Sequence, residues 1–426
     1  MNSAHDWFTQ GRFGLFIHWG LYASAARHEW VMSREQIPVA EYEKYLQVFD
    51  PDLYDPHQWA ADAKAAGMTY AVLTTKHHDG FCLFDSQLTD YKATNTPAGK
   101  DLVREYVDAL REAGLRVGFY HSVIDWHHPD FPIDVVHPQR DVEDAPEQNK
   151  SRDVAKYREY LHGQVRELLT NYGQVDYIFF DFSYPDREYR GMPGKGRADW
   201  GSEDLYAMCR ELQPDMIIND RLDLGSQSDI VTPEQYQPSA PMMRDGAEVA
   251  WEACQTLNGS WGYDRDNHDY KSPAMLVKML VDGVSKNGNL LLNVGPTARG
   301  NFDPRARGSL AAIGEWMDLH ERSIRGAGAS SFTPPTDCRY TQRGNRLYLH
   351  LFSWPMRHVH LAGLAGKIAY AQLLNDASEV SFTEADPHQQ AQNTTPGGQS
   401  ADTVTLTLPI VAPEVAVPVV EIFLKD

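Results

Sequence analysis

The chain has few cysteines, and their spacing suggests neither disulfides nor a metal site. It holds four in 426 residues, without a CxxC pair or zinc-finger spacing. Scattered cysteines of this kind are typical of reduced thiols. The N-terminus, MNSAHDWFTQGRFG, lacks a basic segment followed by an apolar one, so nothing marks it as a signal peptide. We therefore expect a cytoplasmic protein.

Long apolar runs and an excess of positive charge are also missing. No stretch approaches the ~18 uninterrupted apolar residues of a membrane-spanning helix. The formal net charge is −20, which repels phosphate backbones and argues against nucleic acid as a partner. No GxGxxG or GxxxxGK[ST] motif follows any apolar run, which weakens a nucleotide-binding interpretation. We expect neither a membrane nor a nucleic-acid partner, and no cofactor.

What the first three quarters of the chain do contain is a repeated unit, an amphipathic helical stretch followed by a short apolar run. Continuous apolar runs are typical of parallel strands buried on both faces. Eight runs alternating with helices predict a (β/α)8-like catalytic barrel, with an open doubly wound sheet as the alternative. The runs are Gly14–His18, Tyr70–Thr74, Val117–His121, Tyr177–Asp181, Met216–Asn219, Ile230–Thr232, Trp251–Cys254 and Leu290–Val294.

The pattern changes beyond about residue 325. Segments such as NRLYLHLFSW and TVTLTLP alternate apolar with polar residues, and a polar loop occupies Gln389–Ser400. Such alternation is typical of antiparallel strands with one buried face. We therefore expect two domains, the barrel over residues 1–325 and a small antiparallel β-sandwich over residues 326–426.

Polar and aromatic residues follow most of the apolar runs or stand in the segments after them. The carboxyl ends of barrel strands share one face, which is where barrel enzymes carry their active sites. Each residue alone also fits a structural role, but their convergence favours a single site. In chain order they are His18, Glu29, Trp30, His77, His78, Tyr120, Asp181, Arg221, Glu234, Glu252 and Trp261.

This mixture of side chains suits a carbohydrate. Aromatic faces stack on the apolar faces of a sugar ring, and polar groups bind its hydroxyls. Two carboxylates can then cleave a glycosidic bond. A metal-dependent barrel hydrolase is one alternative, although HExxH spacing is absent and the adjacent His77 and His78 point in different directions. A non-catalytic carbohydrate-binding protein is another.

Several motifs together resemble a known enzyme family. The stretches GRFGLFIHWGLYA, HEW, TKHHDGFCLFDS, GFYHS, WGYDRD and GNLLLNVGPTARG resemble those of α-L-fucosidases of glycoside hydrolase family 29. The resemblance covers about residues 7–303, while the tail matches only in pattern. It implies a retaining, exo-acting enzyme that removes terminal α-L-fucose through a covalent intermediate without a metal. Transfucosylation, the aglycone and a homo-oligomeric state are left open.

The resemblance also implies roles for individual residues. It makes Asp181 the nucleophile, two positions after Phe179, where many relatives carry Trp. Two acid/base candidates remain, Glu234 in TPEQY, which we favour, and Glu252 in WEACQ. The implied fucose-binding residues are His18, Glu29, Trp30, His77, His78, Tyr120, Arg221 and Trp261.

The expected mechanism sets conditions on both carboxyl groups. Asp181 has to be ionised at neutral pH, and we expect Arg221 to lower its pKa by stabilising the charged form. Glu234 has to deliver a proton, and we expect a less polar setting for it. A retaining enzyme further needs the two carboxyl groups roughly 5–5.5 Å apart.

Overall fold

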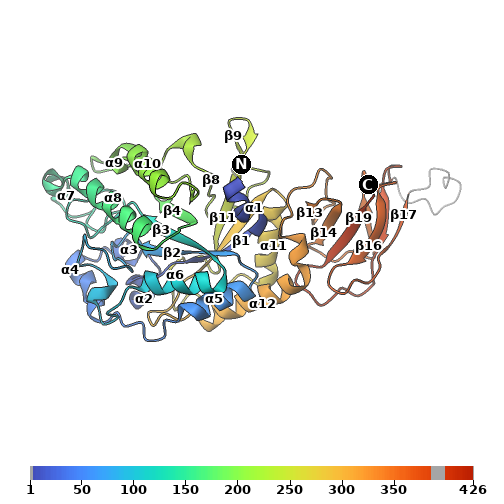
Figure 1. Ribbon diagram of the computed structural model, residues 1–426, viewed down its shortest axis with the longest axis horizontal. Coiled ribbons are helices and arrows are strands. Elements are labelled where there is room, and N and C mark those ends of the chain that lie inside the picture. Colours follow the sequence, from blue (N-terminus) through green and yellow to red (C-terminus); the bar gives the residue numbers. More distant parts are fainter. Residues whose placement is uncertain (1–2, 385–398, 426) are drawn as a thin grey trace.

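The computed structural model describes residues 3–384 and 399–425 and contains a nearly closed barrel of eight parallel strands (Figure 1). The strands lie in the order β7-β4-β3-β2-β1-β12-β11-β8. This is chain order running once around a ring, whose two ends are consecutive strands, so the barrel is confirmed and the doubly wound alternative is wrong. The strands are β1 (Phe13–Ile17), β2 (Tyr70–Lys76), β3 (Arg116–Ser122), β4 (Tyr177–Asp181), β7 (Ile217–Ile218), β8 (Ile230–Val231), β11 (Ala250–Thr256) and β12 (Gly288–Val294).

The gap in the barrel lies between β7 and β8, its two shortest strands. No strand pairing joins them among the described residues. Asp229 spans the gap instead: its backbone N–H donates to the carbonyl of Ile218 at 3.0 Å, and its side chain accepts from the Ile218 N–H at 2.8 Å. A carboxylate thus substitutes for part of the missing ladder and holds the start of β8 beside β7.

Helices surround the barrel, and their ends follow local sequence signals. Asp55, Asp101, Asp153, Ser272 and Asp303 each accept a hydrogen bond from a backbone N–H in the first helical turn. The helices are α1 (Asp6–Gly11), α2 (Tyr22–Ala25), α3 (Val31–Arg34), α4 (Val39–Tyr42), α5 (Pro56–Ala65), α6 (Leu102–Ala113), α7 (Ala145–Gln148), α8 (Val154–Asn171), α9 (Arg197–Trp200), α10 (Ser202–Leu212), α11 (Pro273–Val284) and α12 (Pro304–His320). None of the helices within the described ranges is both long and apolar enough to cross a bilayer.

The expected alternation of strands with helices breaks down between β7 and β11. That part of the chain, all of it described, holds a 3-10 turn (Gly225–Gln227) and a hairpin of β9 (Met243–Arg244) and β10 (Ala247–Glu248), but no α-helix. The expectation of a helix in every unit was therefore wrong here. Without a covering helix, the segment after β8 stays near the surface.

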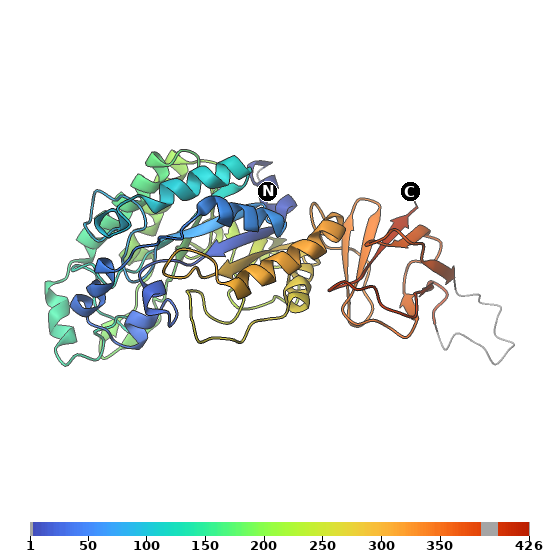
Figure 2. The same ribbon diagram turned by 90° about the horizontal axis from the view of Figure 1, so that it is seen from below.

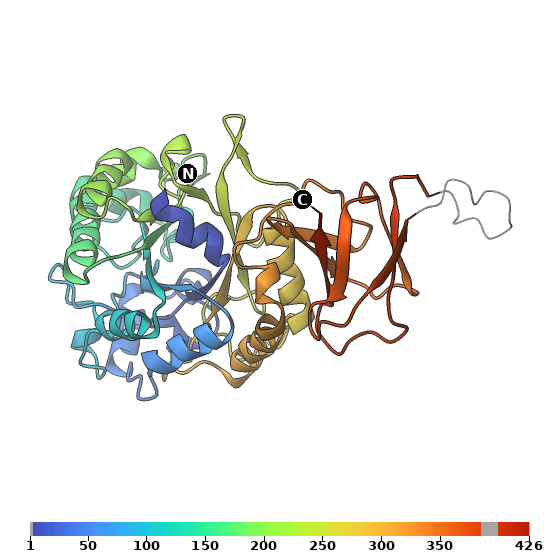
Figure 3. The same cartoon turned by 45° about the vertical axis from the view of Figure 1, so that its right-hand side comes forward.

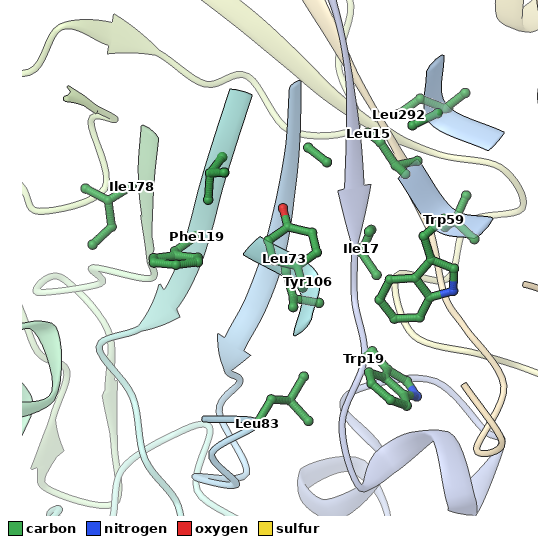
Figure 4. Packing of buried hydrophobic residues seen from close by; sticks show 14 of the residues in the cluster. Leu15, Ile17, Trp19, Trp59, Leu73, Leu83, Tyr106, Phe119, Ile178 and Leu292 are labelled. Atoms are coloured by element: carbon green, nitrogen blue, oxygen red, sulfur yellow. The ribbon is translucent and has the colours of Figure 1, made fainter. Parts of the chain in front are cut away.

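Two hydrophobic clusters lie on the two sides of each barrel strand. In β4, Ile178 and Phe180 pack outward against the helices, while Tyr177 and Phe179 pack inside the barrel. Figure 4 shows Ile178 in the outer layer. Because successive side chains alternate, Asp181 follows Tyr177 and Phe179 on the inner face. This accounts for an unbroken apolar run that ends in an inward-facing carboxylate.

The C-terminal part forms two antiparallel sheets around a separate apolar cluster (Figure 2). This agrees with the predicted sandwich. Most of the polar loop at Gln389–Ser400 lies outside the described residues. The four-stranded sheet contains β13 (Cys338–Arg343), β14 (Arg346–Leu351), β19 (Val419–Leu424) and β16 (Ile368–Leu373), and the three-stranded sheet contains β15 (His358–Leu361), β18 (Val404–Thr407) and β17 (Ser381–Glu384).

The sandwich contacts α11 and α12, at the side of the barrel (Figure 3). The Trp316 indole N–H on α12 donates to the carbonyl of Val417 at 2.8 Å. On α11, Asp282 forms an ion pair of 2.7 Å with Arg339 of β13. The position of the domain boundary, at residues 325 and 326, stays a prediction.

Candidate active site

A pocket of about 310 Å³ opens at the carboxyl ends of the barrel strands. Most of the residues predicted from the sequence line it, although they come from segments far apart in the chain. Those that do are His18, Glu29, Trp30, His77, His78, Tyr120, Asp181, Glu234 and Trp261. Arg221 lies against two of them, and only Glu252 lies elsewhere.

Asp181 stands in the pocket, held by two donors. The Tyr120 hydroxyl donates to its Oδ2 at 2.8 Å, and Arg221 Nη1 donates to its Oδ1 at 3.1 Å. His78 Nε2 lies 3.7 Å from Oδ2. The side chain is 14% exposed, so one edge of the carboxylate remains open to the pocket.

Burial decides the charge state of Asp181. It raises the pKa to about 6, because removal from water disfavours the ionised form and the negative charge of Glu234 adds to this. Arg221 and the hydrogen bond from Tyr120 oppose the rise. The expectation that Arg221 holds the pKa low is therefore wrong in its net direction, although Asp181 is still mostly ionised at pH 7.

Glu234 follows β8 and shares the guanidinium of Arg221 with Asp181. Arg221 Nη2 donates to Glu234 Oε2 at 3.0 Å. The guanidinium is itself held by Thr232, to whose hydroxyl and carbonyl it donates at 3.1 and 2.9 Å. Glu234 is 40% exposed, so the less polar setting expected for it is absent. One planar cation thus fixes the two carboxylates relative to each other.

Glu252, the other acid/base candidate, lies deeper in the barrel. It is fully buried, accepts hydrogen bonds from the hydroxyls of Tyr70 and Tyr177, and does not line the pocket. Burial raises its pKa to about 8, so it is mostly neutral at pH 7. On β11 it comes two residues before Cys254, which does reach the pocket. This geometry suits a structural carboxyl group.

The histidines of the pocket are neutral hydrogen-bonding groups. Burial lowers the pKa of His18 and His78 to about 3 and that of His77 well below its usual value. His18 Nδ1 lies 2.6 Å from Asn293 Oδ1, and His78 Nδ1 lies 2.6 Å from Ser122 Oγ. In His18 and His78 the Nε2 atom therefore remains for a ligand. A neutral ring of this kind can bind the hydroxyls of a sugar.

Glu29 ties two rim segments of the pocket together. Its carboxylate accepts from the backbone N–H groups of Trp261 and Gly262 at 3.1 and 2.8 Å. The indole of Trp261 packs against the ring of His18, with ring centroids 5.1 Å apart and an interplanar angle of 33°. A β-carbon at Gly262 would crowd the ring of Tyr22 and the Glu29 backbone, so this close approach needs glycine.

The pocket is also lined by residues that were not predicted from the sequence. Phe179, which stands where many relatives carry Trp, also lines the pocket. Inner-face alternation along β1 and β11 could have found Phe16 and Cys254, but no sequence signal identifies the loop residues. The lining residues that were missed are Phe16, Arg34, Phe182, Gln235, Cys254 and Gly259.

A metal site is not apparent in the same region. No group of three or more His, Cys, Asp or Glu side chains in the described parts of the chain is placed to bind a metal ion. The paired histidines contact Tyr120 and Ser122 instead. The metal-dependent alternative thus lacks a donor set in the described residues.

Comparison with known proteins agrees with this geometry. A family model described as α-L-fucosidase matches residues 1–322. The chain belongs to the α-L-fucosidase family. Among curated relatives, the plasma α-L-fucosidase of Homo sapiens is 29% identical over 382 residues, covering 82% of this chain and 76% of the human protein.

Solved structures of the family also superimpose on the whole chain. α-L-Fucosidase isoenzyme 1 from Paenibacillus thiaminolyticus is 46% identical with a TM-score of 0.91, covering 100% of this chain and 99% of that one. A family 29 enzyme from Bacteroides thetaiotaomicron, trapped as a covalent intermediate with 2-fluoro-fucosyl fluoride, is 27% identical with a TM-score of 0.83, covering 100% and 97%.

Proposed function

We propose that this chain is a retaining, exo-acting α-L-fucosidase that hydrolyses terminal α-L-fucosides by double displacement. The observation that carries the proposal is the pairing of Asp181 and Glu234 on the guanidinium of Arg221, at a pocket that both carboxylates line. The pocket, of about 310 Å³, ends against the apolar cluster that fills the barrel, which suits a chain end better than the middle of a polymer. Family membership supports the identity of the sugar.

In the first step Asp181 attacks the anomeric carbon and the glycosidic C–O bond breaks. Glu234 gives its proton to the departing oxygen, so the aglycone leaves as a neutral alcohol. The open edge of Asp181 faces the pocket, while Tyr120 and Arg221 hold the carboxylate in place. The fucosyl ester that forms has the inverted configuration.

In the second step Glu234, now ionised, removes a proton from a water molecule. The hydroxide equivalent attacks the anomeric carbon, the ester bond breaks and Asp181 is released as a carboxylate. Two inversions give net retention. Attack by a second sugar in place of water would give transfucosylation, which we include in the proposal.

The neutral histidines bind the ring without competing for the proton. His18, His77 and His78 line the pocket, and a neutral imidazole both donates and accepts hydrogen bonds. Glu29 has a pKa raised by burial, while its backbone N–H partners oppose the rise. Trp261 provides the aromatic face for the apolar side of fucose.

The direct test removes the nucleophile and supplies another. We expect Asp181→Ala to lose hydrolysis of an aryl α-L-fucoside, and added azide to restore turnover with β-fucosyl azide as product, because azide takes the place of the carboxylate. α-Fucosyl azide as the product, or full hydrolysis by the variant, would contradict the assignment.

Two cheaper measurements address the alternatives. Activity that survives prolonged EDTA treatment argues against the metal-dependent hydrolase. Fucose binding without any turnover by the wild-type protein would favour the non-catalytic carbohydrate-binding protein. The cytoplasmic location predicted from the sequence stays a prediction, and the oligomeric state stays open.

A further inference from the structure

A second cavity, of about 380 Å³, lies at the opposite end of the barrel, where the strands begin. Its walls include Thr69, which directly precedes β2, and Arg116, the first residue of β3. Ser122, at the other end of β3, pairs with Asp181, so about 20 Å of strand separates this cavity from the proposed nucleophile. A ligand bound here would not touch the sugar.

This cavity lies between the barrel and the sandwich. Trp7 and Gln10 line it from α1, on the barrel side, whereas Arg343 is the last residue of β13 in the sandwich. Gly326 connects the two sides: its N–H donates to the carbonyl of Gln10 at 3.0 Å. Its φ is 68°, and a β-carbon on it would lie 2.8 Å from the side-chain oxygen of Gln10. The close approach of the two domains here therefore needs glycine.

The lining of the cavity is positively charged. Three arginines line it, and none of its lining residues in the described parts of the chain is acidic. In the whole chain, acidic side chains outnumber basic ones by 59 to 39. A cavity with three cations and no acid is therefore not what the composition favours. The three are Arg116, Arg325 and Arg343.

The charge of these arginines is only partly compensated. Arg116 Nη1 pairs with Asp176 at 2.9 Å, and Arg325 Nε lies 3.1 Å from Glu321 Oε2. Arg343 is exposed, and its side chain forms no hydrogen bond or ion pair with any residue that the structure describes. Two acids thus face three guanidiniums. A guanidinium carries five N–H donors, so the two paired arginines also keep donors for a ligand.

Trp7 adds an aromatic surface beside the cations. Its side chain is partly buried, and the Arg116 guanidinium lies 5.7 Å from the centroid of its ring. The indole is held edge-on against Tyr70, with ring centroids 5.5 Å apart. A phosphate group has oxygens that accept from several guanidiniums at once, whereas a carboxylate pairs in one plane with a single fork. A ring attached to that phosphate can pack on the indole.

We infer that this cavity, lined by Trp7, Arg116, Arg325 and Arg343, binds a small phosphate ester. The arginines bind the phosphate, and Trp7 binds the ring that carries it. Because the lining residues come from both domains, the bound ester holds the sandwich against the barrel and stabilises the folded protein. The inference is independent of the proposed function.

The test measures the binding of phenyl phosphate and of inorganic phosphate to the full chain by calorimetry, at one ionic strength set with sodium chloride. We expect phenyl phosphate to bind more tightly, because its ring adds a contact with Trp7, and to raise Tm above the value in sodium chloride alone. Arg343→Gln should weaken the binding of both ligands roughly tenfold or more, the usual effect of losing charged hydrogen bonds. Since the Arg343 side chain has no partner in the described residues, the variant should fold like the wild type.

A matched control separates this site from general charge effects. Arg166 is an exposed arginine on α8 that lines neither cavity, so Arg166→Gln should leave both affinities unchanged. Equal binding by the wild type and Arg343→Gln would overturn the inference, and so would equal losses in the two variants.

Two further ligands test the chemistry and the place of binding. Benzoate, which has the same ring with a carboxylate, should bind roughly tenfold more weakly than phenyl phosphate. Equal affinity for benzoate would overturn the assignment of a phosphate, and equal affinity for inorganic phosphate would overturn the role of Trp7. Displacement of phenyl phosphate by fucose would place it in the active-site pocket and would also contradict the inference.

Discussion

Two carboxyl groups face the interior of the same barrel, and their surroundings differ in one essential respect. Asp181 ends β4 beside the cation Arg221, whereas Glu252 lies within β11 between the hydroxyls of Tyr70 and Tyr177. Burial raises the pKa of both, to about 6 for Asp181 and to about 8 for Glu252. At pH 7 the first is mostly ionised and the second mostly neutral.

The depth of a carboxyl group along its strand determines which protonation state it prefers. At the carboxyl end of β4, a residue from the next strand segment, Arg221, can reach the carboxylate and offset part of its desolvation. Two residues below the pocket, Glu252 meets uncharged donors, so the neutral acid is favoured. A carboxyl group on the inner face of the barrel thus favours the ionised form at one depth and the neutral form at the other.

The largest effect on activity should come from replacing the carboxylate of Asp181. We expect Asp181→Asn to lower kcat for an aryl fucoside by roughly three or more orders of magnitude, because an amide cannot form the fucosyl ester. Glu252→Gln, its matched control, should stay within about tenfold of the wild type since a neutral group replaces a neutral group. Equal losses in steady-state kinetics would abolish the contrast between the two sites.

The next effect separates the acid/base candidates. Glu234→Ala should lose roughly a hundredfold or more in kcat/KM on fucosides with poor leaving groups, and far less on those with good ones, because only poor leaving groups need protonation. Glu252→Ala should show no such dependence on the leaving group. A steeper dependence for Glu252→Ala would reverse our choice.

A smaller effect concerns the pH profile. With the pKa of Asp181 near 6, kcat/KM should fall as pH drops through about 6, since the nucleophile has to be ionised. Glu234 raises that pKa, so Glu234→Gln should move the acid limb to lower pH. Measurement on a substrate with a good leaving group keeps the rate observable. A limb that stays in place or moves to higher pH would show that the two carboxyls are not coupled in this way.

The smallest effect on activity, though measurable in stability, belongs to Glu252. Its folded pKa is raised to about 8, so between about pH 4.5 and 8 the folded state binds a proton that the unfolded state releases. The wild type therefore loses stability as pH rises through this window, by up to about 5 kcal/mol. Glu252→Gln should gain in Tm relative to the wild type between pH 5 and pH 8. A pH-independent difference in Tm would mean that Glu252 is not neutral in the fold.

Much of the fold could be predicted because burial leaves a pattern in the chain. The run from Tyr177 to Asp181 is apolar because its strand is covered on both faces, and alternation alone places Asp181 on the same face as Phe179. The predicted alternation of strands and helices was wrong between β7 and β11. There the side chain of Asp229 partly replaces strand pairing, and no α-helix follows either strand.

The site was less predictable, since proximity across loops leaves no periodic signal. Phe182 and Gln235, which directly follow the two carboxylates in the chain, both have positive φ, 84° and 52°. Such angles in residues other than glycine are held by surrounding contacts. No sequence signal predicts these two backbone conformations.

The sequence by itself determined the alternation of strands and helices, the family resemblance and the residues that converge on one face, because hydrophobic period and short motifs are local properties. Only the tertiary structure decided between Glu234 and Glu252 as the carboxyl that shares Arg221 with Asp181. It also decided the protonation preferences of these groups, because desolvation and the distance to a cation depend on neighbours brought together by folding.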